Sequence, residues 1–188
     1  MKKYIVFAGV NGAGKTTFYQ TNYEIHEMPR INIDEIVRKD GDWKKREDVI
    51  KAGLLAVRLV KRYIDEGISF NQETTLCGKS IIKNIKKAKE KDYKIELYYV
   101  GVNSPETAIE RVKARVLAGG HGIPEEDIRR RYKESLNNLK KIIPICDRVE
   151  LFDNTVKFRH IAVFEYGKCL DIDDSIPNWC AGICALYA

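Results

Sequence analysis

The stretch "YIVFAGVNGAGKTTFYQ", residues 4–20, changes character twice, from an apolar β-branched run to a glycine-rich turn and then to a helical pattern. The turn fits G-x-x-x-x-G-K-[ST] in full, from Gly9 to Thr16. Between a strand and a helix, such a turn binds phosphate because glycines let backbone N–H groups face the anion and the helix N-terminus adds partial positive charge. An ordinary glycine-rich turn rarely matches both the pattern and its flanks. The stretch therefore predicts a nucleotide-binding P-loop.

The chemistry of the loop predicts ATP and Mg²⁺ as cofactors. Lys15 is expected to reach the β- and γ-phosphates, and the Thr16 hydroxyl to bind the metal. The residues expected to contact the nucleotide from this loop are Gly9, Asn11, Gly12, Ala13, Gly14, Lys15, Thr16 and Thr17.

Apolar runs similar to residues 4–8 recur along the chain and alternate with helical patterns, which indicates βαβ units and a parallel sheet with helices on both faces. The predicted strands are 4–8, 31–33, 68–70, 95–100 and 149–152, and the predicted helices are 15–21, 43–66, 79–91 and two within 104–143. The expected fold class is α/β, a P-loop NTPase fold. It has a doubly wound five-stranded parallel sheet, an arginine-rich helical lid over 104–143, and a C-terminal hairpin and tail over 158–188.

The helix predicted over 43–66 carries apolar residues at the 3.6-residue period, which favours a stripe that packs on the core. The members of this stripe are Val49, Ile50, Leu54, Val57, Val60 and Ile64.

Length and charge narrow the class of protein. The 188 residues fit one domain, 1–188. The net charge of +6 suits an anionic ligand, but basic residues are scattered among acids, so nucleic acid is not an expected partner. The first apolar run is short for a signal peptide and no run is long enough to span a membrane, so we expect a cytoplasmic protein with no membrane contact. Five cysteines without a C-x-x-C pair indicate free thiols.

The class of P-loop protein follows from other motifs. The sequence has no D-x-x-G, N-K-x-D or L-S-G-G-Q, which argues against GTPases and transport ATPases and leaves a small kinase. Its acceptor site is expected at the carboxyl ends of the strands. Asp34 follows the second strand, where it would take the proton of an attacking hydroxyl, help to hold Mg²⁺ through water, or only cap a helix. Glu73, Thr74 and Thr75 follow the third, where they would bind a polar acceptor, or a threonine would cap the next helix.

Arginines in the segment 104–143 are expected to neutralise charge on the transferring phosphate. We favour Arg115 and Arg131 for this role, because residues 129–131 fan around a helix and cannot all face the site. The glycines of "GGHG", residues 119–122, suggest a hinge for a closing lid. His121 is either a loop residue or a contact to phosphate on the substrate. Asn154 of "FDNT" is either an adenine contact or part of a turn.

Together, "GVNGAGKTT", "INIDEIVR", "ETTLCG", "RVKARVLAGGHGIPEEDIRRRYKESLNNL" and "FDNT" resemble the zeta-toxin-like kinases, over residues 3–155. The resemblance implies ATP-dependent phosphorylation of a hydroxyl on a UDP-activated amino sugar, UDP-N-acetylglucosamine, and makes an antitoxin protein a candidate partner. It implies that Asp34 is the general base, that Lys15 with Arg115 and Arg131 stabilises the phosphate, and that Glu73 serves the acceptor. The chain departs from the family in having His121 where an arginine is usual.

Two alternatives remain open from the sequence. One is a kinase of another small metabolite, such as a nucleoside, a nucleotide or a sugar acid. The other is a nucleotide-dependent binding module with little catalysis.

Overall fold

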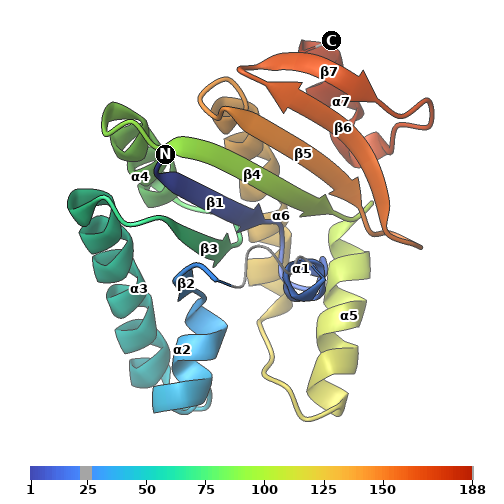
Figure 1. Cartoon of the computed structure of the whole chain (residues 1–188). Coiled ribbons are helices and arrows are strands. Elements are labelled where there is room, and N and C mark those ends of the chain that lie inside the picture. The colour runs from blue at the N-terminus through green and yellow to red at the C-terminus, as the bar shows by residue number, and fades with distance from the viewer. Residues whose placement is uncertain (22–26, 188) are drawn as a thin grey trace.

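The computed structural model describes residues 1–21 and 27–187, and its centre is one mixed β-sheet (Figure 1). The strands are β1 (Lys3–Ala8), β2 (Arg30–Ile31), β3 (Phe70–Thr74), β4 (Lys94–Gly101), β5 (Arg148–Asp153), β6 (Arg159–Glu165) and β7 (Lys168–Ile172). Their order in the sheet is β2-β3-β1-β4-β5-β6-β7. The α/β class with a parallel core is confirmed, since β2, β3, β1, β4 and β5 are mutually parallel.

The predicted strand count is too low for the whole sheet. The sequence predicts a five-stranded sheet and, separately, a C-terminal hairpin, whereas β6 pairs antiparallel with β5 and β7 pairs antiparallel with β6. The described part of the chain therefore forms a seven-stranded sheet with an antiparallel edge. The residues after β7, which the sequence left without a prediction, form α7 against the core, where Trp179 and Ile183 are buried.

The helices cover both faces of the sheet. They are α1 (Lys15–Gln20), α2 (Ile33–Asp40), α3 (Arg46–Glu66), α4 (Lys79–Glu90), α5 (Pro105–Leu117), α6 (Glu125–Ile142) and α7 (Asn178–Tyr187). Figure 1 shows α1 and α6 on opposite sides of the sheet. Side chains of α3, α4, α6 and α7 share the main core cluster, while α1 packs with the other face of β1 through Tyr19 and Phe7. No helix among residues 1–21 and 27–187 is long and apolar enough to cross a membrane.

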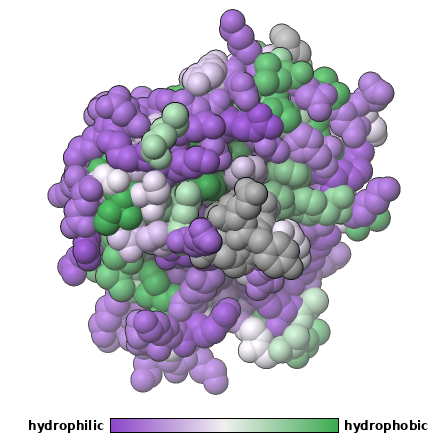
Figure 2. Space-filling model, in the orientation of Figure 1, coloured by the Kyte–Doolittle hydropathy of each residue, from purple (hydrophilic) through white to green (hydrophobic). Residues whose placement is uncertain are grey.

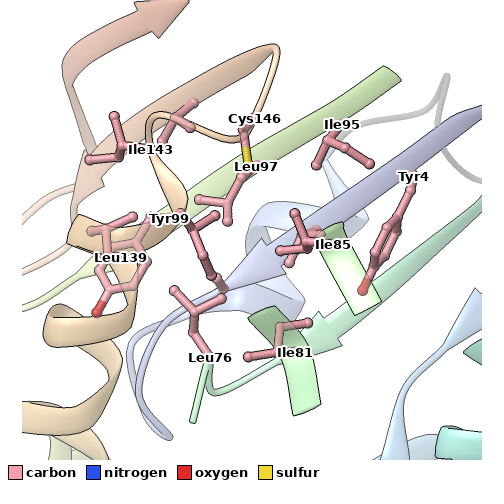
Figure 3. Packing of buried hydrophobic residues seen from close by; sticks show 14 of the residues in the cluster. Tyr4, Leu76, Ile81, Ile85, Ile95, Leu97, Tyr99, Leu139, Ile143 and Cys146 are labelled. Atoms are coloured by element: carbon pink, nitrogen blue, oxygen red, sulfur yellow. The ribbon is translucent and has the colours of Figure 1, made fainter. Parts of the chain in front are cut away.

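Alternation along β1 divides the core in two. Tyr4, Val6 and Ala8 belong to the main cluster, and Ile5 and Phe7 belong to the opposite one. Figure 3 shows the main cluster from close by, with side chains of strands and helices interdigitated, among them Tyr4, Leu76, Ile81, Ile85, Ile95, Leu97, Tyr99, Leu139, Ile143 and Cys146. Hydrophilic side chains cover most of the molecular face in Figure 2.

Two strand boundaries differ from the prediction and move site residues. The second strand ends at Ile31, and Ile33 already begins α2. The third strand was expected over 68–70, yet β3 runs from Phe70 to Thr74. Its sequence "FNQET" is polar because the strand ends in the functional site instead of in the core. An apolar run therefore does not mark this strand.

The apolar stripe predicted for α3 is only partly correct. Val60 and Ile64 are buried, but Ile50, Leu54 and Val57 are 51%, 54% and 54% exposed. The predicted member Val49 is half-buried. The buried face instead includes the small residues Ala52 and Ala56, which permit close packing. A periodic pattern identifies an apolar face. This helix has two such faces, and the one with the alanines is the one that packs on the core.

Candidate active site

The loop between β1 and α1 has the backbone that its sequence predicts. Gly9 and Gly14 have φ of 140° and 102°, values that side chains beyond glycine rarely adopt. A Cβ at Gly9 would lie 2.2 Å from the carbonyl oxygen of Val100, so β4 also requires glycine there. The loop leads into the first turn of α1, where Thr16 and Thr17 are exposed.

Lys15 lies under this loop and is only 7% exposed. Its Nζ donates to the carbonyl oxygen of Val10 at 3.1 Å. Burial lowers the pKa of Lys15, the carboxylates of Glu73 and Asp34 oppose that shift, and the guanidinium of Arg115 adds to it. One buried ammonium therefore interacts with two acids and an arginine from three other segments.

The carboxylate of Glu73 accepts a hydrogen bond from the P-loop residue Thr16. Thr16 Oγ1 donates to Glu73 Oε1 at 3.0 Å, and Asn32 Nδ2 and Arg30 Nη2 donate to Glu73 Oε2 at 3.0 and 2.5 Å. The hydroxyl and the carboxylate are the oxygen donors that Mg²⁺ prefers, and adjacent ligands of an octahedron with 2.0–2.1 Å bonds lie about 3 Å apart. The two side chains fit a magnesium site. Glu73 thus contacts the nucleotide-binding loop, whereas the sequence predicted that it would contact the acceptor.

Arg30, which the sequence analysis missed, supports this carboxylate. Its guanidinium lies 3.5 Å from the centre of the Tyr19 ring, and its Nε donates to Glu35 Oε1 at 2.8 Å. The side chain is 9% exposed, so this arginine is a buried counter-charge for Glu73. The sequence does carry a signal for this role, because Arg30 is a charged residue at the start of a strand, within "PRINID".

Asp34 does not cap α2. The cap is Asn32, whose side chain accepts a hydrogen bond from the Asp34 backbone N–H at 2.8 Å. The Asp34 carboxylate faces the lid, where its Oδ2 lies 3.4 Å from Nε2 of His121. It is one-third exposed, which leaves it accessible to a ligand in the cavity.

The glycine pair between α5 and α6 ends a helix and does not form an open hinge. Gly119 donates to the carbonyl oxygen of Val116, and Gly120 to that of Arg115, each at 2.9 Å. This is the Schellman pattern, with Gly119 at a φ of 87°. A Cβ at Gly120 would lie 2.7 Å from Cγ of Arg115. The turn therefore packs the lid loop tightly on the end of α5.

Two lid arginines point to the site from different helices. Arg131 of α6 donates from Nη1 to Oδ1 of the P-loop residue Asn11 at 3.0 Å. Arg115 of α5 donates from Nη2 to the backbone oxygen of His121 at 2.9 Å and lies 3.1 Å from its Nε2. The neighbours of Arg131 form ion pairs with acids of α5 and α6: Arg129 with Glu106, and Arg130 with Asp127 and Glu134.

Two further predicted residues, Thr74 and Asn154, bond to the backbone. Thr74 Oγ1 accepts from the backbone N–H of Leu76 at 3.0 Å, so it forms a turn at the end of β3. Asn154 Nδ2 donates to the carbonyl oxygen of Ala13 at 2.8 Å and thus braces the P-loop from the end of β5. The Asn154 amide thus bonds to the backbone of the P-loop, a contact that the sequence did not predict.

A cavity of about 600 Å³ opens beside the P-loop. It brings together predicted residues that are far apart in the sequence: Asn11, Lys15, Asp34, Glu73, Thr74, Thr75 and Arg131. Trp43, Asn32 and Cys77 also line it and were not predicted. Arg115 and His121 are not among the residues that line it, and His121 is linked to it by Asp34, whose Oδ2 lies 3.4 Å from His121 Nε2. A phosphate cradle thus adjoins a cavity lined by acids and arginines.

The fold and this site define a P-loop protein of the kinase class. A family model described as Zeta toxin matches residues 1–163, and the chain belongs to the zeta toxin family. An uncharacterized protein of Haemophilus influenzae is 38% identical over 130 residues, which cover 69% of this chain and 92% of that protein. Membership of this family supports phosphotransferase activity.

Solved structures are similar in fold. A chain of the AvrRxo1-ORF1:AvrRxo1-ORF2 complex with sulphate ions has a TM-score of 0.72 at 15% identity, and the match covers 100% of this chain. This protein spans 63% of the length of that chain. A structure of the same complex with ATP has a TM-score of 0.69. A chain of the PezAT toxin-antitoxin system of Streptococcus pneumoniae has a TM-score of 0.58 at 20% identity, covering 82% of this chain and 69% of that one.

Proposed function

We propose that this protein is an ATP-dependent kinase that transfers the γ-phosphate to a hydroxyl of a small acceptor, a UDP-activated amino sugar such as UDP-N-acetylglucosamine. The observation that carries the proposal is the meeting of Lys15 and Asp34 at one cavity beside the P-loop. ATP as donor is supported by the related fold that was solved with ATP. The nucleotide sugar is supported by the resemblance of the motifs to zeta-toxin-like kinases.

In the proposed mechanism each residue has one task. Asp34 accepts the proton of the attacking hydroxyl, since a carboxylate at the cavity wall is accessible to the acceptor. Lys15 binds oxygens of the β- and γ-phosphates, and Arg115 and Arg131 neutralise the charge that spreads over the transferring group. The backbone of residues 9–14 holds the phosphates, with Asn154 bracing the loop.

Thr16 and Glu73 would hold Mg²⁺, and we assign Glu73 to this task in preference to the acceptor. Bound Mg²⁺ neutralises phosphate charge. Thr74 and Thr75, which line the cavity, remain the proposed acceptor contacts, and His121 lies behind them in contact with Asp34. Because ATP is the donor, we place the reaction in the cytoplasm.

The candidate partner is an antitoxin protein. The family membership supports it, and so do the related folds that were solved as AvrRxo1-ORF1:AvrRxo1-ORF2 and from the PezAT toxin-antitoxin system.

Mass spectrometry of the reaction tests the proposal. Wild type, Lys15→Met and Asp34→Asn are incubated with ATP, Mg²⁺ and a panel containing UDP-N-acetylglucosamine, nucleosides, nucleotides and sugar acids. We expect only wild type to add one phosphoryl group to UDP-N-acetylglucosamine. If another compound of the panel were phosphorylated instead, that compound would replace UDP-N-acetylglucosamine as the proposed acceptor, and the proposed kinase activity would stand. ATP binding without any phosphorylated product would favour a binding module and contradict the proposal.

A further inference from the structure

His121 lies at the junction of three side chains from three parts of the chain. Its ring stacks on Trp43, with ring centres 3.6 Å apart and planes 5° from parallel. Its Nε2 lies 3.1 Å from Arg115 Nη2 and 3.4 Å from Asp34 Oδ2. The side chain is only 12% exposed. One ring nitrogen therefore contacts both of the groups that the proposed mechanism needs, the base Asp34 and the phosphate-binding Arg115.

Two neighbours fix the position of the His121 ring, Arg115 on the lid and Trp43 on the opposite wall. The helix cap at residues 118–120 turns the lid loop back on α5, and Arg115 also holds the backbone oxygen of His121. Trp43 comes from the connection between α2 and α3, which Figure 1 places across from α5. The stack thus joins the wall formed by α2 and α3 to the lid formed by α5 and α6.

The hydrogen bond between Arg115 and the ring requires an unprotonated Nε2, because a guanidinium only donates. Burial lowers the pKa of His121; the carboxylate of Asp34 opposes this shift, and the guanidinium groups of Arg115 and Arg38 add to it. These are the charged groups that face the ring, Asp34 and Arg38 from α2 and Arg115 from α5. The lowered pKa favours the neutral ring, and a neutral ring accepts from Arg115 through Nε2 when its proton lies on Nδ1.

We propose that His121, clamped by Trp43, is a positioning residue that keeps Arg115 and Asp34 from pairing with each other. The proposal rests on the proposed function of this site. A direct guanidinium–carboxylate pair would lower the proton affinity of Asp34 and occupy Arg115, because an opposite charge at close range lowers a carboxyl pKa by about 1 to 3 units. A neutral acceptor between them holds the arginine ready for phosphate and leaves the carboxylate free to take a proton.

Turnover kinetics test the spacer role with ATP, Mg²⁺ and UDP-N-acetylglucosamine. We expect His121→Ala to lower kcat by about 10- to 100-fold, as misplaced catalytic groups do, with the Kd for ATP unchanged. His121→Gln, a neutral side chain whose amide oxygen can accept from Arg115, should recover most of the loss. Trp43→Ala should lower kcat in the same direction, and the double variant with His121→Ala should be no worse than His121→Ala alone.

A matched control is His160→Ala on β6. His160 also contacts an aromatic ring, Phe152, and a carboxylate, Glu150 at 3.1 Å, yet Glu150, unlike Asp34, is not among the residues that line the cavity. Its kcat should equal that of wild type. The spacer role is wrong if His121→Ala keeps kcat within twofold, or if His121→Gln is as slow as His121→Ala.

A second measurement needs no acceptor. In a Trp179→Phe background Trp43 is the remaining tryptophan of two, and its fluorescence should be quenched as His121 becomes protonated. Asp34→Asn should move that transition to lower pH, because the carboxylate raises the pKa of His121. His121→Ala should abolish it. Ring ¹⁵N spectra of unmutated protein give the same titration if Trp179→Phe fails to fold.

The two measurements separate the two proposals. If wild type phosphorylates no acceptor, the proposed function fails, and the fluorescence still decides the arrangement around His121. A Trp43 signal that ignores both pH and His121→Ala would overturn the arrangement.

Discussion

Thr16 Oγ1 lies 3.0 Å from Glu73 Oε1, although the two residues are 57 positions apart. The pairing of β1 with β3 explains the contact, because Phe7 lies opposite Glu73 in the parallel register, at the end of the strand that enters the P-loop. The carboxylate thereby reaches the hydroxyl that follows the P-loop lysine. We therefore expect Glu73 to help hold the proposed Mg²⁺ together with Thr16.

Glu73→Gln should weaken the use of Mg²⁺. The amide keeps the shape of the side chain but removes the negative charge that favours a divalent cation. We expect the Mg²⁺ concentration for half-maximal activity to rise about 10-fold or more, consistent with effects of supporting groups around metals. Glu134→Gln, on the same cavity, is the control and should leave the Mg²⁺ dependence unaltered. An unchanged dependence in Glu73→Gln would remove this residue from the metal site.

Lys15→Met should abolish activity without loss of stability. Burial disfavours the ammonium, which lowers its pKa, and an apolar chain of similar length avoids that cost. The variant should lose activity by about 10²-fold or more, since it removes a charge that contacts the transferring group. Its Tm should equal or exceed that of wild type. A clear fall in Tm would mean that the ammonium is needed for folding.

Gly120→Ala should disturb the lid and spare the rest of the protein. The added Cβ would lie 2.7 Å from Cγ of Arg115, so that side chain must shift. We expect kcat to fall by about 10-fold or more, because Arg115 is displaced from its contacts with His121. Gly53→Ala in α3 is the matched control, since its Cβ meets no atom within 4 Å. That variant should be as active as wild type and more stable by about 0.5–1 kcal/mol.

Two substitutions on α3 should separate its buried face from its exposed face. Ile64→Ala removes a side chain that is 1% exposed and should cost about 2–5 kcal/mol of unfolding free energy. Leu54→Ala, at 54% exposure, should change that free energy by about 0.5 kcal/mol or less. Urea unfolding measures both values. Similar losses at the two positions would show that the exposed face is covered in solution.

The sequence was sufficient for the parallel core of the fold because its signals are local. The P-loop pattern and the apolar strands each depend on a few neighbouring residues. The full extent of β3 was missed because its residues are polar, and the edge position of the hairpin depends on pairing with β5. The face of α3 was misjudged because the alanines that pack on the core carry little apolar signal.

The sequence predicted several of the residues that line the cavity but not the contacts that they make. Asp34 and Arg131 meet at one cavity, as expected for residues after strands and on the lid. The contact of Glu73 with Thr16 depends on strand register, and the stack of Trp43 on His121 depends on how two distant loops approach. Arg30 was missed because its partners come from three separate segments.

The phosphorylation of UDP-N-acetylglucosamine, followed by mass spectrometry, tests the central claim most directly. With ATP and Mg²⁺, wild type should convert it to a product one phosphoryl group heavier and release one ADP for each product. Asp34→Asn should bind ATP normally and form almost none. The account is contradicted if Asp34→Asn forms product at the wild-type rate, or if wild type binds ATP and phosphorylates no small molecule.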